Sequence, residues 1–302
     1  MSDHASWPSV GVVVPTRRRP EQLRRALVSI LSQDYTGPLT VVVVFDGTEP
    51  DASLTGARIR AIANSRTPGL AGARNTGILA LDTDLVAFCD DDDEWLPTKL
   101  ETQVELLRRS GADFVASGVV FAYGDSATAR VAGTVVTHDQ LLRSRMAMLH
   151  SSTFVIRRVA LLHQIGLVDE TIPGGQGEDW DLLLRASETA PIRCANLPLV
   201  RVSWSRDSYF GRRWDTKVAS LRWMLEHHRG LVGDRRAAAR LYGQLAFAHA
   251  ARGSRAEALF WSGKAFARRP LEPRTYLAVA VVARITSADA VLDWLHRRGH
   301  GV

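Results

Sequence analysis

Nearly continuous apolar runs alternate with amphipathic stretches along the first 123 residues. The runs at 10–14 (VGVVV), 39–45 (LTVVVVF) and 84–89 (DLVAFC) lack the polar alternation of half-exposed strands. Such runs are typical of strands that are covered on both faces of a parallel sheet. The spacing of apolar residues further predicts helices over 20–33, 70–81 and 97–109 and another strand over 112–123.

This order of elements predicts an α/β fold with a mostly parallel, Rossmann-like sheet built from right-handed crossovers. In such sheets, ligands bind at the carboxyl ends of the strands. Arg17, Asp46 and the acidic run Asp90–Asp93 each follow a predicted strand. We therefore expect these side chains to line one site.

The pattern changes in the second half of the chain. Residues 152–162 predict a short strand leading into a helix, and residues 173–188 predict a glycine-rich loop leading into another helix. Residues 191–204 predict an extended segment, and everything from about residue 211 onward is predicted to be helical.

The predicted domains are residues 1–210 and a C-terminal helical extension over residues 211–302. Small residues at 246, 253, 258 and 265, followed by Pro270, occupy the positions of the small residues and the closing proline of a tetratricopeptide unit. A helical hairpin packed on the first domain explains a single unit equally well. Both interpretations therefore stay open.

The formal charge of +6 is unevenly distributed along the chain. Residues 201–302 contain 19 Lys and Arg against 8 Asp and Glu, a net of +11, whereas the preceding residues carry 19 against 24, a net of −5. The difference indicates either two units with different partners or long helices decorated with arginine. No signal-peptide pattern and no apolar window of about 18 residues occurs, so we expect a cytoplasmic protein.

Four consecutive carboxylates, Asp90 to Asp93, follow the buried run at 84–89, and Glu94 adds a fifth. Adjacent like charges repel by about 1 kcal/mol per pair at ~4 Å even in water. A divalent cation would offset this repulsion, because Mg²⁺ and Mn²⁺ prefer carboxylate oxygens together with phosphate oxygens of a substrate. The alternative is a solvated acidic turn before the next helix, whose N-terminus favours negative charge.

Five segments together resemble family 2 glycosyltransferases of the GT-A fold. They are VGVVVPTRRRPEQLRRALVSILSQ, VVVVFDGTEPD, GLAGARNTGI, VAFCDDDDEWLPTKLE and GEDWDLLLR, which follow the family's order and spacing over roughly residues 8–205. The resemblance implies a GT-A-type nucleotide-sugar-binding fold. It also implies an inverting, metal-dependent transfer of a sugar from a nucleotide diphosphate sugar to an acceptor hydroxyl.

The resemblance assigns the nucleotide-binding side of the site. Pro15, Thr16 and Arg17 correspond to the segment that lines the base and ribose, although most relatives have Tyr-Asn after the threonine. Asp46 corresponds to the acid that accepts a hydrogen bond from the base imide, which favours a UDP or dTDP sugar. Arg74 lies in the stretch that closes over the diphosphate.

In the acidic run, Asp92 corresponds to the family's metal ligand, and Asp90 and Asp91 correspond to acids that contact the ribose or support the metal. The implied cofactor is Mg²⁺ or Mn²⁺. Asp93 and Trp95 are interpreted as structural residues, a helix cap and a packed aromatic ring.

Glu178 and Asp179 correspond to the family's acidic pair near the acceptor. Asp179 is our predicted general base, because an inverting displacement needs a carboxylate opposite the leaving group to take the acceptor's proton. The structural alternative for either acid is the N-cap of the helix that follows.

The remaining predicted contacts lie on the acceptor and sugar side. His150 and Ser152 are expected to contact sugar hydroxyls, although a core histidine is the alternative for His150. Trp180 is expected either to stack on a sugar ring or to pack in the core. Arg206 is expected to contact the diphosphate.

Other classes of function are weighed against this interpretation. A catalytically degenerate nucleotide-sugar-binding protein that assembles partners through its helical tail is the main alternative. A nucleotidyltransferase would need a Gly-rich, Lys-bearing loop in place of PTRRRPEQ, a dinucleotide dehydrogenase would need G-x-G-x-x-G, and no nucleic-acid-binding module is recognised. The expected partners are a nucleotide sugar, a hydroxyl-bearing acceptor (a glycan, a lipid-linked sugar or a small molecule) and, through the basic tail, an anionic membrane surface or a protein.

Overall fold

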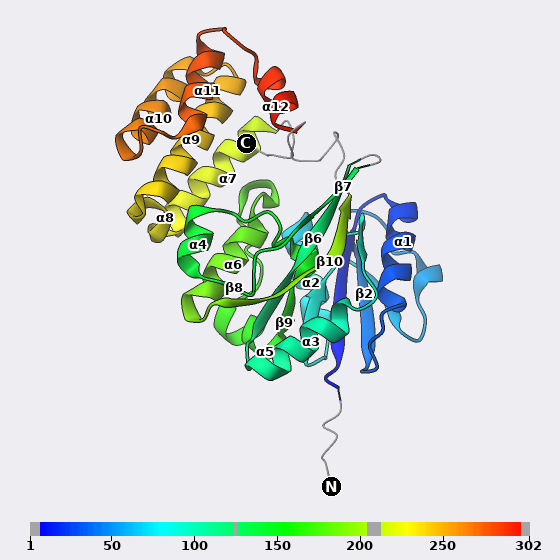
Figure 1. Cartoon of the computed structure of the whole chain (residues 1–302). Coiled ribbons are helices and arrows are strands. Elements are labelled where there is room, and N and C mark those ends of the chain that lie inside the picture. Colours follow the sequence, from blue (N-terminus) through cyan, green and yellow to red (C-terminus); the bar gives the residue numbers. More distant parts are fainter. Residues whose placement is uncertain (1–6, 124–125, 204–212, 297–302) are drawn as a thin grey trace. The chain divides into compact units, whose positions relative to one another are not determined.

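The computed structural model describes residues 7–123, 126–203 and 213–296, and the chain divides into two compact units (Figure 1). Unit 1 consists of Met1–Leu141, Arg145–Glu170 and Glu178–Arg206. Unit 2 consists of Asp207–Val302 together with two short segments, Leu142–Ser144 and Thr171–Gly177. The predicted boundary after residue 210 falls outside the described residues and stays a prediction.

A ten-stranded sheet forms the centre of unit 1, with the order β3-β2-β1-β4-β9-β6-β10-β5, while β7 pairs with β6 and β8 with β10. The strands are β1 Val10–Thr16, β2 Leu39–Phe45, β3 Ile59–Ala63, β4 Leu85–Phe88, β5 Asp93–Trp95, β6 Phe114–Tyr123, β7 Ser126–Arg130, β8 Val135–Val136, β9 Val155–Arg157 and β10 Ile192–Ser203. Because β9 runs antiparallel to both β4 and β6, six main strands (β1, β2, β3, β4, β6 and β10) share one direction. The predicted α/β fold with a mostly parallel sheet is confirmed.

Helices cover both faces of this sheet. Those of unit 1 are α1 Pro20–Leu31, α2 Leu70–Ala80, α3 Lys99–Ser110, α5 Arg158–Ala160, α6 Glu178–Thr189 and the first part of α4 His138–Arg143, with a 3₁₀ turn at Ser151–Thr153. Apolar residues of α1 and α3 share one core with alternate residues of β1, such as Val12 and Val14. Helix α2 lies against the opposite face, where a Cβ on Gly77 would come within 2.3 Å of Val13.

The acidic run departs from one expectation. Asp93 is not a helix cap, because it begins the short strand β5, which pairs antiparallel with β10, and α3 begins only at Lys99 after Thr98. Trp95 is packed as expected, with 3% of its surface exposed. The extended backbone from Asp93 to Trp95 pairs at the sheet edge, and this pairing takes precedence over the local preference of acids for a helix start.

Unit 2 is helical. Its helices are α7 Trp214–His227, α8 Arg229–Gly233, α9 Arg235–Ala251, α10 Arg255–Arg268, α11 Pro273–Val282 and α12 Ala288–His296. Asp234 caps α9 by accepting hydrogen bonds from the backbone N–H groups of Arg236 and Ala237. Gly253, with φ of 82°, makes the turn between α9 and α10, and Ala258 and Ala265 are fully buried on the inner side of α10. Within the described ranges, no helix has both the length and the apolarity to cross a membrane.

Candidate active site

The carboxyl ends of the parallel strands place most of the predicted residues at one edge of the sheet. Thr16 ends β1, Asp46 follows β2, Asn64 follows β3 and Asp90 comes two residues after β4. Strand β9 runs the other way, so the segment before it, which contains His150 and its neighbouring serines, reaches the same edge. This is the position in which sheets of this class bind ligands.

Two of the four consecutive acids share one arginine. Arg19 donates through Nη1 to Asp91 Oδ1 at 3.1 Å and to Asp92 Oδ2 at 2.7 Å. The hydroxyl of Thr16 donates to the other oxygen of Asp91 at 2.8 Å. Burial, followed by repulsion from Asp93 and Asp90, raises the pKa of Asp92 to about 7, although Arg19 acts in the opposite direction. Asp92 therefore binds a proton readily near neutral pH, and a cation would compete with that proton.

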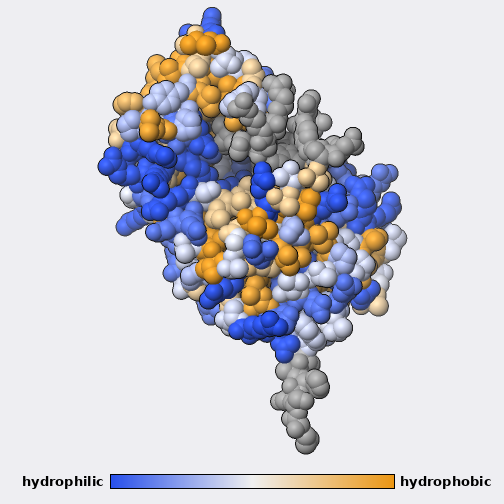
Figure 2. Space-filling model, viewed as in Figure 1, coloured by the Kyte–Doolittle hydropathy of each residue, from blue (hydrophilic) through white to orange (hydrophobic). Residues whose placement is uncertain are grey.

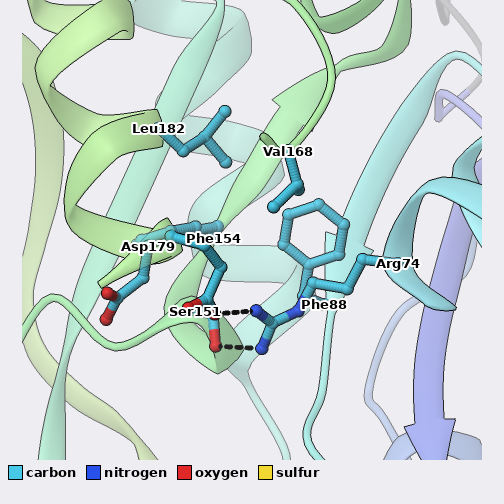
Figure 3. A pocket seen from close by; sticks show the side chains of 8 residues that line it. Arg74, Phe88, Ser151, Phe154, Val168, Asp179 and Leu182 are labelled. Carbon is cyan, nitrogen blue, oxygen red and sulfur yellow. Dashed lines mark hydrogen bonds and ion pairs between the residues drawn. The ribbon is translucent and has the colours of Figure 1, made fainter. Parts of the chain in front are cut away.

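Arg74 joins the acidic run to the second acidic pair. Its guanidinium, only 2% exposed, donates to Asp90 Oδ1 at 2.5 Å and to Glu178. It also donates to Ser151 Oγ at 2.8 Å (Figure 3). Burial tends to raise the pKa of Asp90, but Arg74 and then His150 outweigh it and hold this pKa below its usual value. Three segments distant in sequence thus meet at one buried cation.

His150 lies between two acids of the run. Its Nδ1 is 3.2 Å from Asp93 Oδ2 and its Nε2 is 3.8 Å from Asp90 Oδ2. Burial tends to lower the pKa of His150, but Asp93 and Asp90 raise it to about 9, so the imidazole is charged at neutral pH. Ser152 donates to the same Asp93 oxygen at 2.5 Å and accepts from the Asp90 backbone N–H at 3.0 Å. One potential metal-ligand atom each from Asp90, Asp93 and His150 lies within 4.8 Å of the others.

Glu178 and Asp179 begin helix α6 and have separate partners. Arg145 donates to both oxygens of Asp179, at 3.0 and 2.8 Å. Burial tends to raise the pKa of Asp179, but the charge and hydrogen bonds of Arg145 outweigh it and hold this pKa below its usual value. The carboxyl is therefore ionised at neutral pH. Burial and then the charge of Asp179 raise the pKa of Glu178, with Arg74 opposing. Figure 3 shows the Asp179 carboxylate pointing away from Arg74 at the margin of a small pocket lined also by Phe88, Phe154, Val168 and Leu182.

The charges of this network do not cancel. Six carboxylates take part (Asp90, Asp91, Asp92, Asp93, Glu178 and Asp179), and four cationic side chains pair with them (Arg19, Arg74, Arg145 and His150). With all ten groups ionised, two negative charges are left. Among the described residues, this arrangement of oxygen ligands and excess negative charge suits one Mg²⁺ or Mn²⁺ ion.

Asp46 forms a second, smaller site beside β1. Its Oδ1 accepts from Asn64 Nδ2 at 2.9 Å and from the backbone N–H of Gly69 at 3.0 Å. Its Oδ2 lies 3.8 Å from Arg17, whose side chain is 60% exposed. One oxygen is therefore fixed by the protein, and the other faces an exposed arginine.

The structure brings most of the predicted site residues into this arrangement, but not all of them. Pro15 is buried inside β1, and Trp180 is 3% exposed, with its indole N–H donating to Leu141 O at 2.8 Å. That contact favours the packing interpretation of Trp180. Arg206 lies outside the described residues.

Sequence reasoning missed Arg19, Arg145 and Asn64 as partners of the predicted acids. Arg19 belongs to the quoted motif PTRRRPEQ, where three consecutive arginines follow β1, and their density was a usable signal. Arg145 and Asn64 occur in segments without a comparable pattern. Arg145 is 34 residues from Asp179, and Asn64 is 18 residues from Asp46.

Known proteins resemble this chain in sequence and in fold. The sequence profile of Glycosyl transferase family 2 matches residues 11–163, just over half of the chain. The glucosyltransferase WfgD of Escherichia coli, which is named for transfer from UDP-Glc to α-D-GlcNAc-diphosphoundecaprenol, is 25% identical over 140 residues, 45% of this chain and 55% of that protein. A pre-mycofactocin glycosyltransferase of Mycobacterium tuberculosis is 31% identical over 209 residues, 65% of this chain and 43% of that protein.

The chain therefore spans about half, or less, of the length of these curated relatives. Among solved structures, Staphylococcus aureus TarS 1–349 in complex with UDP-GlcNAc superimposes with a TM-score of 0.59 at 17% identity. The match covers 97% of this chain and 92% of that one. At this level of identity the match shows a shared fold.

Proposed function

Because this chain belongs to glycosyl transferase family 2, we propose that it transfers a sugar from a nucleotide diphosphate sugar, a UDP or dTDP sugar, to an acceptor hydroxyl with inversion. The observation that carries the proposal is the buried network in which Arg74 ties the acidic run to the Glu178-Asp179 pair. A donor phosphate and an acceptor hydroxyl need these two groups of acids within reach of one another. TarS, which shares the fold, binds UDP-GlcNAc.

The Asp46 site supports the choice of base. Its Oδ1 is already saturated by Asn64 and Gly69, so Oδ2 is the oxygen left to accept an imide N–H from uracil or thymine. Arg17, exposed beside it, can stack on the base through its guanidinium plane. Pro15 and Thr16 position this segment at the end of β1.

Asp92 and Asp90 are the residues that we propose to hold the metal, with Asp91 bound to the ribose side. The fit rests on the excess of carboxylates over cations in the network and on Asp92, whose pKa burial and neighbouring acids raise to about 7, so that a bound cation would favour its ionised form. When bound, Mg²⁺ or Mn²⁺ would stabilise the charge that develops on the departing nucleotide diphosphate.

Asp179 is our proposed general base. It is ionised at neutral pH, and as the acceptor oxygen forms its bond to the anomeric carbon, the Asp179 carboxylate takes the hydroxyl proton while the bond to the diphosphate oxygen breaks. Arg145 holds both carboxylate oxygens and fixes their orientation. Glu178, neutralised by Arg74, supports Asp179, and His150 and Ser152 line the same edge for contacts with sugar hydroxyls.

The helical region after residue 210 is proposed as the part that brings the enzyme to its partner. Its net positive charge suits an anionic membrane, which would place the protein on the inner face of that membrane as a peripheral protein. A lipid-linked sugar, a glycan or a small molecule with a free hydroxyl would serve as the acceptor.

Donor hydrolysis without an acceptor tests the proposed function against a degenerate sugar-nucleotide-binding protein. We expect release of UDP from a UDP sugar in the presence of Mn²⁺, a loss of about 10²-fold or more in turnover in Asp179→Asn, and unchanged UDP binding in that variant. Glu188→Gln, an exposed acid on the same helix, is the matched control. An inactive wild type that still binds UDP would favour the degenerate protein, and an α-linked product from an α-linked donor would exclude inversion.

A further inference from the structure

Helix α10 has two apolar faces. Because successive residues of an α-helix are rotated by about 100°, Ala258, Trp261 and Ala265 lie on one side. These three are buried in unit 2. The opposite side carries Leu259, Phe260 and Phe266, which are 50%, 55% and 51% exposed. A helix that is apolar on both sides is typical of one whose outer side also has a partner.

The outer side of α10 is apolar without interruption. The residues that fall within this arc are 256, 259, 260, 263, 266 and 267, namely Ala, Leu, Phe, Gly, Phe and Ala. Charged residues occur only outside the arc, where Arg255 borders one edge and Lys264 the other. The Lys264 Nζ lies 5.0 Å from the centre of the Phe260 ring.

Exposed apolar residues continue beyond α10. Leu271 is 77% exposed in the following turn, and on α11 Tyr276 and Val279 are 52% and 41% exposed. Eight of the thirteen large apolar side chains that are exposed in the described part of the chain lie between residues 259 and 294. Figure 2 shows apolar residues gathered over the end of unit 2 that contains α10 and α11. We call Leu259, Phe260, Phe266, Leu271, Tyr276 and Val279 the apolar face.

The charge around the apolar face identifies its partner. The described residues 213–296 contain 14 Lys and Arg against 7 Asp and Glu. Besides Arg255 and Lys264, which border the apolar face, Arg269 follows α10 directly and is exposed. Leucine and aromatic side chains bordered by cations are the composition of surfaces that enter the headgroup region of anionic lipid bilayers. A neutral protein partner would not require the cations.

We propose that the apolar face of α10 and α11 inserts into the surface of an anionic phospholipid membrane, with Arg255 and Lys264 bound to lipid phosphates. This deepens the peripheral membrane location in the proposed function and depends on that function only for its purpose, which is access to an acceptor at the membrane. Binding itself depends on unit 2 alone.

Vesicle flotation with the full chain tests the proposal. Wild type is expected to float with phosphatidylglycerol-containing vesicles and to remain unbound with pure phosphatidylcholine. Phe260→Ser/Phe266→Ser should lower the partition coefficient by about tenfold or more, because two half-buried rings no longer enter the bilayer. Arg255→Gln/Lys264→Gln should remove most of the salt-sensitive part of binding. The matched control is Val28→Ser, which removes a side chain that is 68% exposed on α1 of unit 1.

Three results would overturn the proposal. They are a wild type that does not float with anionic vesicles, a folded Phe260→Ser/Phe266→Ser variant that floats like wild type, and a wild-type dimer that this variant converts to a monomer. The last result would assign the apolar face to a contact between two copies. Folding of each variant is checked by circular dichroism. Donor hydrolysis without vesicles reports on the active site, so loss of flotation with unchanged hydrolysis separates this proposal from the proposed function.

Discussion

Replacing Arg74 by methionine tests whether the buried network is held together by this one cation. The guanidinium is 2% exposed and pairs with Asp90 and Glu178, while Ser151 takes a third hydrogen bond. Methionine fills a similar volume but leaves the two carboxylates without their main partner. Breaking a buried ion pair from one side costs about 3–5 kcal/mol, because the other charge stays buried.

The loss of stability in Arg74→Met is limited by other groups that still act on the two carboxylates. His150 still lies 3.8 Å from Asp90, and Glu178 escapes part of the cost by binding a proton. Proton uptake by Glu178 therefore keeps the cost toward the lower end of this range. We therefore expect Arg74→Met to lower the free energy of unfolding at pH 7 by about 3 kcal/mol.

The loss should depend on pH with a defined sign. In the wild type Arg74 holds the pKa of Asp90 below its usual value, so this stabilisation is present above that usual value and disappears as the pH falls through the lowered pKa. The difference between wild type and Arg74→Met should accordingly be largest near neutral pH and shrink toward acid. Urea unfolding followed by circular dichroism at several pH values measures it.

Two further variants test whether the unpaired carboxylates cause the loss of stability expected in Arg74→Met. Arg74→Met/Glu178→Gln should recover part of the stability, because the double variant no longer carries the unpaired Glu178 charge. Arg185→Met, which removes the Arg185–Asp181 pair within α6, should lose stability without the loss of UDP binding that we expect in Arg74→Met. A cost below about 1 kcal/mol in Arg74→Met, or no recovery in the double variant, would refute the reasoning.

Three other predictions concern single side chains. Arg19→Gln should tighten Mn²⁺ binding in the absence of donor by about tenfold, because the Arg19 guanidinium is bound to the Asp92 carboxylate in the wild type. Electron paramagnetic resonance of free Mn²⁺ measures the affinity, and an unchanged value would contradict competition between Arg19 and the metal for Asp92. Asn64→Ala should weaken UDP binding several-fold and reduce the preference for UDP over nucleotides with other bases, since Asp46 loses a hydrogen-bond donor. Calorimetry measures both affinities, and an unchanged preference for UDP would contradict this role of Asn64. Burial lowers the pKa of Lys99, whose Nζ has no hydrogen-bond partner, to about 7. Stability should therefore rise with pH between about 7 and 10.5, and Lys99→Met should raise the urea midpoint at pH 7 and flatten that rise.

The strands that the sequence predicted best are those whose pattern is set by burial alone. Continuous apolar runs at 10–14, 39–45 and 84–89 fall in β1, β2 and β4 because both faces of these strands are covered. Strand β3, with the sequence IRAIA, and strand β5, with DEW, were missed. Both lie at edges of the main strand order, where pairing with β2 or β10 stabilises segments that have little apolar pattern of their own.

The acids of the site were predictable from the sequence, but which cation pairs with which acid was not. Carboxylates after a buried strand stand out in a sequence because such a cluster is costly without a partner. A single arginine such as Arg145 has no comparable signal, because isolated arginines are common in any sequence, although the three consecutive arginines after β1 did stand out. Arg19 is 72 residues from Asp91, and Arg74 is 104 residues from Glu178, so only the fold determines that they pair.

The crowding of Asp90 to Asp93 is relieved first by the protein itself. Arg74 and His150 neutralise the acids nearest the sheet, and Arg19 is divided between Asp91 and Asp92. Asp92 shares its ion-pair partner, Arg19, with Asp91, and burial together with Asp93 and Asp90 raises its pKa to about 7. A carboxylate in that condition gains most from an added cation. The internal ion pairs and the divalent metal that we propose would therefore act together, since the pairs hold the acids side by side and a cation bound at Asp92 would displace the proton that its raised pKa favours.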